Sequence, residues 1–319
     1  MRVAVMGCGR WGSFHAWYAD HVGHEVVLWG REGSGHMQEL METRKNEYLE
    51  LSESIHLSQN LQQTADFAEL MVISVSAQQL RAFLPSLKTA LAGRKKKILL
   101  CMKGLEIGTG KRLSTVFREV MGGDMPVAVW VGPGHVQDFL RGIPNCMVIS
   151  SEDMELTREL VEAFSSSLIR FYYGKDLLGT EIGAAAKNVI GLAAGMLDGL
   201  HYGSLKGALM ARGASELSRL VAAMGGDAMT VYGLSHLGDY EATLFSPHSN
   251  NRRFGEDLIA GRPFAKLAEG VYTAEALMAL SEQYQVELPI CRTVYEIVCH
   301  HKEPREQLTQ LFLRATKAE

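Results

Sequence analysis

Residues 3–12, VAVMGCGRWG, decide the fold of this 319-residue chain. A short apolar run is followed by Gly7, Gly9 and Gly12 in the spacing G-x-G-x-x-G, and then by a stretch typical of a helix. This is the context that a dinucleotide-binding fingerprint requires. The three glycines would allow, in turn, a tight turn, close approach of a pyrophosphate to the backbone, and close packing of the helix on the strand. The alternative is a glycine turn without a ligand, but the position of the next apolar run favours a Rossmann unit.

That next apolar run, residues 25–29, ends in Gly30, Arg31 and Glu32, where Rossmann folds select their cofactor. A carboxylate at this place binds the ribose 2′-hydroxyl of NAD, whereas an arginine suits the 2′-phosphate of NADP. Arg31 favours NADP, although a solvated surface arginine is the alternative. Glu32 lies one position late and keeps NAD open. We therefore expect NADP or NAD, with a preference for NADP.

The composition argues against several classes of function. A formal net charge of −4 gives no general attraction to nucleic acid or to an acidic membrane. The basic run at residues 94–97 lies between a glycine and an apolar run, which indicates a solvated loop. No stretch of the sequence approaches the roughly 18 apolar residues of a membrane span, and the first apolar run is too short for a signal peptide. The five cysteines include no C-x-x-C pair, so we expect a reducing, cytoplasmic setting and no metal site.

The distribution of apolar residues predicts two domains. The first half alternates apolar runs with helix-like stretches, which favours a mostly parallel sheet whose strands are buried on both faces. The predicted strands begin at Arg2 and continue with residues 25–29, 69–75, 97–102, 127–131, 146–150 and 168–173. From about residue 181 the apolar residues recur at helical spacing. We predict an α/β fold with a Rossmann domain at residues 1–178, an all-α domain at residues 179–319, and a ligand site in the cleft between them.

Two of the predicted strands end in residues suited to ligand binding. In an open α/β sheet, ligands bind beyond the carboxyl ends of the strands. Lys103 follows one such strand and precedes a glycine, and Gly132 and Gly134 follow the next. We expect both places to face the cofactor, with a solvent-exposed side chain as the alternative for Lys103.

Lys187 and Asn188 interrupt a helix-like stretch that otherwise consists of small and aliphatic residues. A buried ammonium group is costly unless it is paired or its pKa is shifted. Small neighbours such as Gly183 and Gly191 would let a cofactor ring approach the helix. A desolvated Lys187, beside Lys103, would have a lowered pKa and would act as general acid or base near neutral pH. The alternative is a lysine whose side chain reaches solvent from the helix.

Two polar segments follow in the helical half. The first is Gly238-Asp239-Tyr240, and the second is SNNRRFG at residues 249–255. The second is typical of a helix start, where backbone N–H groups and two guanidinium groups would hold a phosphate. Its alternative is an N-cap followed by exposed arginines.

Together these segments resemble the NAD(P)-dependent glycerol-3-phosphate dehydrogenases of the bacterial type. The resemblance extends over nearly the whole chain and rests on motifs in a fixed order. These are G-x-G-x-W-G at Gly7, Asn46-x-x-Leu49, Lys103-Gly104, Gly132-Pro133, A-x-K-N-V-I at Ala185, Arg212-Gly213, Gly233-Leu234, Leu237-Gly238-Asp239, Asn251-Arg252-Arg253-Phe254-Gly255 and Glu269-Gly270. The resemblance implies hydride transfer between sn-glycerol 3-phosphate and the nicotinamide, working mainly towards reduction of dihydroxyacetone phosphate for phospholipid synthesis. It also implies a homodimer.

The resemblance further implies roles for individual residues. Lys187 would accept the hydroxyl proton, Lys103 would polarise the reacting oxygen, and Asp239 would orient both lysines. The implied substrate contacts are Lys103, Gly132, Gly134, Lys187, Asn188, Asp239, Ser249, Asn250, Asn251 and Arg252. The implied cofactor contacts are Gly7, Gly9, Arg10, Trp11, Gly12, Arg31, Lys103, Val136, Asn250, Leu267 and Glu269. This chemistry requires no metal.

Four positions depart from the family pattern. Asn250 stands where arginine is usual, Gly134 where serine or threonine is usual, Val136 where a small alanine is usual, and Ser76 where proline is usual. Loss of the charge at position 250 would cost about 1.5–3 kcal/mol of binding unless Arg252 substitutes for it. These changes are compatible with a divergent enzyme, with an altered substrate preference, or with weakened activity. The alternative assignments are a dehydrogenase of the β-hydroxyacid or 6-phosphogluconate type and a non-catalytic NAD(P)-binding sensor.

Overall fold

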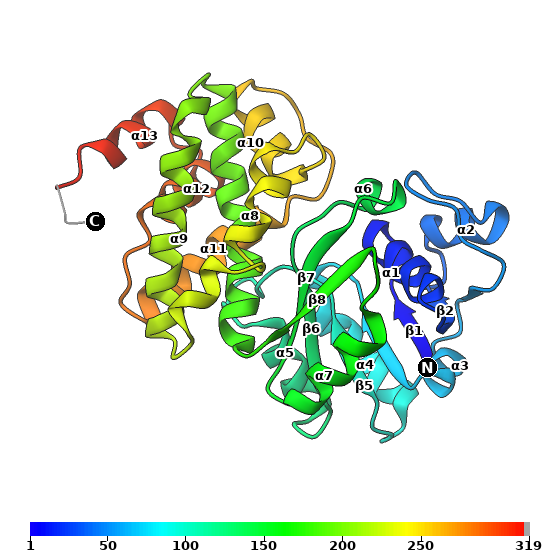
Figure 1. The fold of residues 1–319 in the computed structure, drawn as a ribbon. Coiled ribbons are helices and arrows are strands. Elements are labelled where there is room, and N and C mark those ends of the chain that lie inside the picture. Colours follow the sequence, from blue (N-terminus) through cyan, green and yellow to red (C-terminus); the bar gives the residue numbers. More distant parts are fainter. Residues whose placement is uncertain (316–319) are drawn as a thin grey trace. The chain divides into compact units, whose positions relative to one another are not determined.

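The computed structural model describes residues 1–315, which form two compact units. The first unit contains Met1–Met102 and Leu113–Leu177, and the second contains Lys103–Arg112 and the residues from 178 onward (Figure 1). The sequence analysis predicted a domain boundary after residue 178, one residue later than the observed division after Leu177, and it assigned residues 103–112 to the first domain. These residues instead join the helical unit, because Leu105 is fully buried in its core and Arg112 forms an ion pair with Glu181 at 2.7 Å.

The first unit is built on a sheet in the order β3-β2-β1-β4-β5-β6-β7-β8. Its strands are β1 (Arg2–Met6), β2 (Glu25–Trp29), β3 (His56–Ser58), β4 (Leu70–Ile73), β5 (Lys97–Leu100), β6 (Val127–Val131), β7 (Asn145–Ser151) and β8 (Ile169–Gly174). Neighbouring strands are parallel except for β6 and β7, so the predicted mostly parallel sheet is confirmed. The sequence did not predict β3, because its three residues are exposed or half-buried and form no apolar run.

Helices cover both faces of this sheet, which explains why its strands are apolar at consecutive positions. Alternate residues of a strand point to opposite faces. Val3 and Val5 of β1 therefore pack in one core with α1 (Arg10–His21) and α7 (Met154–Phe164). Ala4 and Met6 pack in another core with α4 (Leu80–Leu91) and α5 (Leu113–Met121). The helices of this unit are α1 (Arg10–His21), α2 (Gly35–Thr43), α3 (Leu61–Phe67), α4 (Leu80–Leu91), α5 (Leu113–Met121), α6 (Val136–Leu140) and α7 (Met154–Phe164).

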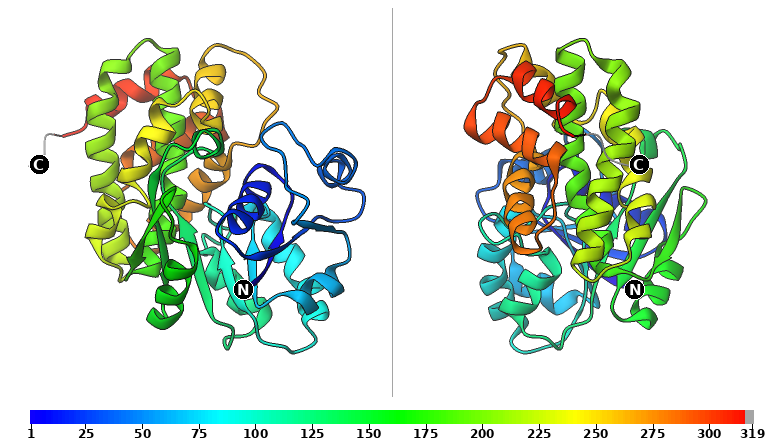
Figure 2. Two further views of the ribbon diagram at one scale, coloured as in Figure 1. Left: turned by 45° about the vertical axis from the view of Figure 1, so that its right-hand side comes forward. Right: turned by 90° about the vertical axis from the view of Figure 1, so that its left-hand side faces the viewer.

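The second unit is helical, as predicted. Its α-helices are α8 (Leu177–Gly199), α9 (Lys206–Ala223), α10 (Asn250–Ile259), α11 (Glu269–Gln283), α12 (Pro289–His300) and α13 (Pro304–Phe312), with short 3₁₀ and π-helical turns between α8 and α10 (Figure 2). None of the helices within residues 1–315 is long and apolar enough to cross a membrane.

Helix α8 is buried along nearly its whole length, and its glycines allow direct backbone packing. A Cβ atom at Gly195 would lie 1.8 Å from the carbonyl oxygen of Arg252 in α10. A Cβ atom at Gly191 would lie 2.8 Å from the methyl group of Thr243. The small residues that the sequence analysis connected with the approach of a cofactor ring therefore serve contacts of α8 within its own unit.

Candidate active site

The G-x-G-x-x-G segment forms a turn between β1 and α1 whose shape requires glycine. Gly7 has a φ of +110°, and a Cβ atom there would lie 2.5 Å from the carbonyl oxygen of Ser74. A Cβ atom at Gly12 would lie 1.8 Å from the carbonyl oxygen of Gly7. A Cβ atom at Gly9, in contrast, would meet no described atom within 4 Å. Gly7 and Gly12 are thus required by the protein's own backbone, while Gly9 leaves an open surface for a ligand.

The same turn leaves the start of α1 ready for an anion. Gly9 is the N-cap residue, and because glycine has no side chain it makes no capping hydrogen bond at this end of the helix. The first N–H groups of a helix have no acceptor within it, and the helix dipole adds positive potential at this end. Open backbone at Gly9 and an uncapped helix start together fit the pyrophosphate of a dinucleotide.

Arg10 lies beside this turn and is held by the segment that follows β6. Its Nη2 atom donates to Gln137 Oε1 at 2.9 Å and lies 3.4 Å from His135 Nδ1. Its guanidinium also lies over the ring of Tyr48, 5.2 Å from the centroid. Burial lowers the pKa of Arg10 from its ordinary value. Arg10 therefore connects the first turn of α1 to the residues that follow β6.

The other two predicted cofactor contacts of this region differ in exposure. Trp11 packs edge-on against Phe14, with the ring centroids 5.5 Å apart. Arg31 is exposed directly after β2, where the sequence analysis expected it to select the cofactor.

Gly132 and Gly134 follow β6 with φ values of +137° and +130°, a region that favours glycine. A Cβ atom at Gly134 would lie 2.5 Å from Phe139 Cζ. The glycine at position 134, where the family usually has serine or threonine, therefore has a structural cause. Its positive φ disfavours a side chain, and the Phe139 ring occupies the space that a side chain would need. Val136 is fully buried at the start of α6 and packs in the same core as Phe139.

A buried cluster of two lysines and one aspartate lies in the helical unit. Lys187 Nζ is 2.7 Å from Asp239 Oδ2, and Lys103 Nζ is 2.8 Å from the same oxygen. The side chains of Asp239, Lys187 and Lys103 are 1%, 9% and 17% exposed. The three residues that the sequence analysis selected for catalysis therefore meet on one carboxylate oxygen.

Burial and charge act in opposite directions on Lys187. Removal from water disfavours its ammonium form, the attraction of Asp239 favours it, and the repulsion of Lys103 disfavours it again. Desolvation is the largest of these effects and lowers the pKa of Lys187 to about 8. Lys187 therefore exchanges a proton close to neutral pH, as a general acid or base must.

Thr243, which the sequence analysis did not select, completes the cluster. It lies four residues after Asp239, on the π-helical segment Glu241–Phe245. Lys187 Nζ donates to Thr243 Oγ1 at 2.7 Å, and that hydroxyl donates to Asp239 Oδ1 at 3.5 Å. The spacing of four residues was a usable signal, because residues i and i+4 share one face of a helical turn.

His236 and Tyr240, also missed from sequence, support the segment that carries Asp239. Both are fully buried. His236 Nδ1 donates to the carbonyl oxygen of Gly183 at 2.8 Å, and the Tyr240 hydroxyl donates to His236 Nε2 at 2.6 Å. Burial lowers the pKa of His236 to about 4, so the ring is neutral and each nitrogen has one role. This pair ties the Asp239 segment to α8 about one turn before Lys187.

Asn188 and Asn251 connect three segments around the lysines. Asn188 Nδ2 donates to the carbonyl oxygen of Lys103 at 3.0 Å, and Asn188 Oδ1 accepts from Asn251 Nδ2 at 3.0 Å. Asn251 Oδ1 in turn accepts the backbone N–H of Gly270 at 2.9 Å. Two of the predicted substrate residues thus belong to one hydrogen-bond network with the backbone of Lys103.

The remaining predicted contacts of the helical unit gather near the start of α10. Ser249 is the N-cap residue, and its hydroxyl accepts the backbone N–H of Arg252 at 3.3 Å. Asn250 Nδ2 donates to the carbonyl oxygen of Leu267 at 3.2 Å. The side chain of Leu267 is exposed, and Glu269 is the first residue of α11.

The side chain of Arg252 is directed elsewhere. Its Nη1 atom lies 2.9 Å from Asp198 Oδ2 and 2.9 Å from Glu256 Oε2. Asp198 is about three helical turns after Lys187 on α8. Because two carboxylates already bind this guanidinium, Arg252 does not replace the charge that is missing at position 250.

The two units together define a class of protein. The first offers an open turn for a dinucleotide on a mostly parallel sheet, and the second holds a buried lysine whose pKa suits proton transfer. This combination is that of a two-domain NAD(P)-linked dehydrogenase.

Comparison with known proteins identifies the family. The model of the NAD-dependent glycerol-3-phosphate dehydrogenase N-terminus matches residues 2–157, and that of the C-terminus matches residues 176–309. The glycerol-3-phosphate dehydrogenases (NAD(P)+) of Pelodictyon phaeoclathratiforme and Prosthecochloris aestuarii are 35% and 36% identical to this chain, over all of it and over 99% and 100% of their own length. The chain belongs to the NAD-dependent glycerol-3-phosphate dehydrogenase family, which confirms the resemblance seen in the sequence.

A solved structure shows the same similarity. The crystal structure of glycerol-3-phosphate dehydrogenase from Coxiella burnetii has a TM-score of 0.91 and 27% sequence identity, and the match covers 98% of this chain and 99% of that one.

Proposed function

We propose that this protein reduces dihydroxyacetone phosphate to sn-glycerol 3-phosphate with NADPH or NADH, and that it also catalyses the reverse reaction. The observation that carries the proposal is the contact of Lys103 and Lys187 with the same oxygen of Asp239. A protein that only binds a dinucleotide has no need of a buried lysine with a pKa of about 8.

The lysine cluster supports a simple division of roles. When bound, the nicotinamide supplies a hydride to C2 of the ketone, or removes one from C2 of the alcohol. Lys187 donates a proton to the oxygen on C2 during reduction and accepts the hydroxyl proton during oxidation. Lys103 stabilises negative charge that develops on this oxygen. Asp239 balances the charge of the two lysines and orients them.

Thr243 and Asp239 also orient the reacting proton. An ammonium group has three donors. Those of Lys187 contact Asp239 and Thr243, each at 2.7 Å, which leaves a third for the substrate oxygen. The position of Lys187 is therefore set before substrate arrives, and this reduces the entropy cost of reaching a reactive geometry.

The start of α10 is the proposed site for the substrate phosphate. Asn250 and Asn251 offer backbone N–H groups and side-chain amides there, directly after the N-cap Ser249 and at the positive end of a helix. Asn250 supplies no full positive charge, so we expect phosphate binding weaker by about 1.5–3 kcal/mol than in a relative with arginine at this position. Gly132, Gly134 and Asn188 remain proposed substrate contacts; Val136, Leu267 and Glu269 remain proposed cofactor contacts.

The proposal has four further parts, which concern cofactor preference, assembly, location and metabolic role. The exposed guanidinium of Arg31 directly after β2 supports a preference for NADPH. The family supports a homodimer, a cytoplasmic location and a role in supplying glycerol phosphate for phospholipids.

A direct assay tests the reaction and the cofactor preference together. Purified protein is mixed with dihydroxyacetone phosphate and either NADPH or NADH, and the near-ultraviolet absorbance of the reduced nicotinamide is followed. Oxidation that depends on the ketone establishes the reaction, and Arg31→Ala should slow it with NADPH more than with NADH. Absence of oxidation, with cofactor binding intact by fluorescence, would overturn the proposed substrate.

A further inference from the structure

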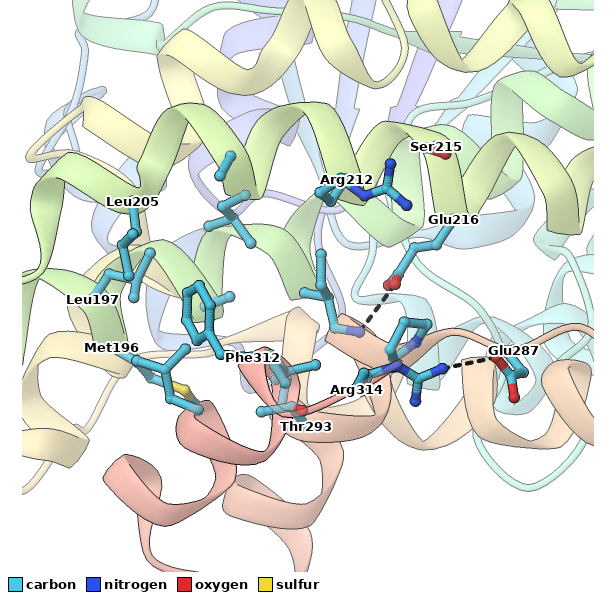
Figure 3. A pocket seen from close by; sticks show the side chains of 18 of the residues that line it. Met196, Leu197, Leu205, Arg212, Ser215, Glu216, Glu287, Thr293, Phe312 and Arg314 are labelled. Atoms are coloured by element: carbon cyan, nitrogen blue, oxygen red, sulfur yellow. Dashed lines mark hydrogen bonds and ion pairs between the residues drawn. The ribbon is translucent and has the colours of Figure 1, made fainter. Parts of the chain in front are cut away.

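The helical unit contains a pocket that the proposed reaction does not use. Its volume is about 1030 Å³, and α8, α9, α12 and α13 line it (Figure 3). Folded interiors contain few voids larger than a water molecule, whereas small-molecule sites span about 300–1,000 Å³. Lys103, Lys187, Asp239 and Thr243 are absent from its lining. The pocket is therefore a feature separate from the lysine cluster, and its size is that of a ligand site.

One part of the pocket wall is apolar. Leu197 of α8, Leu209 of α9 and Ile297 of α12 contribute buried aliphatic side chains, and Leu308 of α13 is half-buried against them. Phe312, at the end of α13, extends into the same part of the pocket although 66% of it is exposed (Figure 3). Water in such surroundings finds few hydrogen-bond partners, so an aliphatic chain that displaces it gains free energy.

Arginine side chains lie along another part of the wall. The side chain of Arg212 forms no hydrogen bond or ion pair with any residue in the described part of the chain. Arg219 donates to the carbonyl oxygen and hydroxyl of Ser215 and to the carbonyl oxygen of Glu287, which are uncharged acceptors. Arg314 uses its charge in an ion pair with the Glu287 carboxylate at 2.8 Å. Among residues 1–315, Arg212 and Arg219 therefore form no ion pair with a carboxylate, although the charge of Glu216 attracts that of Arg219.

The carboxylate of Glu216 does not neutralise Arg212. Glu216 lies one turn after Arg212 on α9, and both line the pocket (Figure 3). Its two oxygens accept the backbone N–H groups of Ile290 and Cys291, each at 2.9 Å, so the carboxylate caps the start of α12. The polar end of the pocket thus carries an excess of positive charge beside an apolar chamber.

We propose that this pocket binds a long-chain carboxylate, with its head group on Arg212 and its aliphatic chain among Leu197, Leu209 and Ile297. Charge complementarity selects the head group, since an unpaired guanidinium binds a carboxylate through paired hydrogen bonds. The apolar wall selects the chain. The proposal goes beyond the dehydrogenase reaction, because neither substrate nor cofactor is needed for the ligand to bind.

Calorimetric titration of the whole chain with dodecanoate, below its micelle concentration and without substrate or cofactor, tests this proposal. We expect saturable binding of one dodecanoate per chain, and binding at least about tenfold weaker for dodecylammonium, which has the same chain and the opposite charge. Arg212→Gln should weaken dodecanoate binding about ten- to a hundredfold. Arg292→Gln, an exposed arginine of α12 outside the pocket, should leave it unchanged.

A second variant tests the apolar part of the pocket. Leu308→Gln alters a half-buried residue of α13 and should weaken dodecanoate binding. Butanoate has the same head group but a short chain, and it should bind too weakly to detect with the unaltered chain or with Leu308→Gln. Absence of saturable dodecanoate binding to the unaltered chain would overturn the proposal, as would equal binding by Arg212→Gln. If Phe312→Ser converts a dimer to a monomer in light scattering and the unaltered chain does not bind dodecanoate, a second copy of the chain covers the pocket and the proposal is wrong.

Discussion

The dinucleotide turn of the first unit and the lysine cluster of the second prepare for charged ligands in opposite ways. The turn at residues 7–12 uses backbone N–H groups, whose positions depend on Gly7 and Gly12, where a Cβ atom would meet the backbone. The cluster uses side chains from Lys103, Lys187 and Asp239, and their protonation depends on burial and on one another. A methyl group added at Gly12 should therefore destabilise the turn, whereas removal of the Lys187 charge should stop proton transfer without disturbing the fold.

The largest effect should come from removing the reacting group of the cluster. Lys187→Met keeps a long side chain but cannot transfer a proton, so kcat should fall about 10²–10⁴-fold. The unfolding temperature should stay unchanged or rise, because the substitution removes a costly buried ammonium group while Lys103 still pairs with Asp239. Steady-state oxidation of the reduced nicotinamide measures the first effect, and thermal unfolding measures the second. Near-normal turnover would exclude Lys187 from the proposed role, and cofactor binding by fluorescence is the control.

Two alanine substitutions in the turn should separate ligand binding from folding. Gly12→Ala places a methyl group 1.8 Å from a backbone oxygen, so we expect a loss of stability of at least about 1–3 kcal/mol. Gly9→Ala meets no described atom within 4 Å, so its unfolding temperature should not change. Its methyl group should nevertheless weaken cofactor binding about tenfold or more by separating the phosphates from their N–H donors. Fluorescence titration measures cofactor binding by both variants, and thermal unfolding measures their stability. A destabilised Gly9→Ala would show that Gly9, like Gly12, is required for folding.

A change at the start of α10 should show whether a missing charge limits substrate binding. Asn250→Arg adds a guanidinium at the proposed phosphate site, and KM for dihydroxyacetone phosphate should fall about ten- to a hundredfold with a smaller change in kcat. Asn250→Gln, which keeps the amide and adds no charge, is the matched control. An unchanged KM in Asn250→Arg would place the phosphate elsewhere.

The smallest effect concerns the pH dependence of the cluster. Since the pKa of Lys187 is about 8, kcat for ketone reduction should fall above that pH and kcat for alcohol oxidation should rise towards it. In Lys103→Met the residual activity should show a higher apparent pKa, because a neighbouring positive charge no longer disfavours the ammonium form of Lys187. Lys103→Arg keeps the charge and should preserve the pH profile. A lower apparent pKa in Lys103→Met would show that Lys103 does not act on Lys187 through its charge.

Much of the fold was predictable because its signals are short in range. The apolar runs identified every strand of the first unit except β3, which has three residues and no apolar run. The helical period identified the second unit. Residues 103–112 were misassigned because the burial of Leu105 in the helical core depends on residues more than seventy positions away.

The candidate site was predictable in its residue types and less so in its geometry. Lys187 stood out from sequence because a charged residue in an apolar helix is unusual, and Lys103 stood out because it follows a strand and precedes a glycine. Asp239 was selected through the family resemblance. Thr243 had only its spacing of four residues from Asp239 as a signal, and nothing in its neighbourhood shows that a lysine from α8 reaches its hydroxyl. The sequence left open whether Arg252 substitutes for an arginine at position 250, because its partner Asp198 is distant in sequence.

The sequence by itself determined the dinucleotide turn, the order of the two units and the family of this protein. Those properties depend on steric limits and hydrophobic periods between residues that are close along the chain. Only the tertiary structure decided that two lysines share one oxygen of Asp239, that the pKa of Lys187 falls to about 8, and that Phe139 fills the space beside Gly134. Desolvation, charge interactions and packing depend on distances in space, and these arise only when the folded chain brings distant residues together.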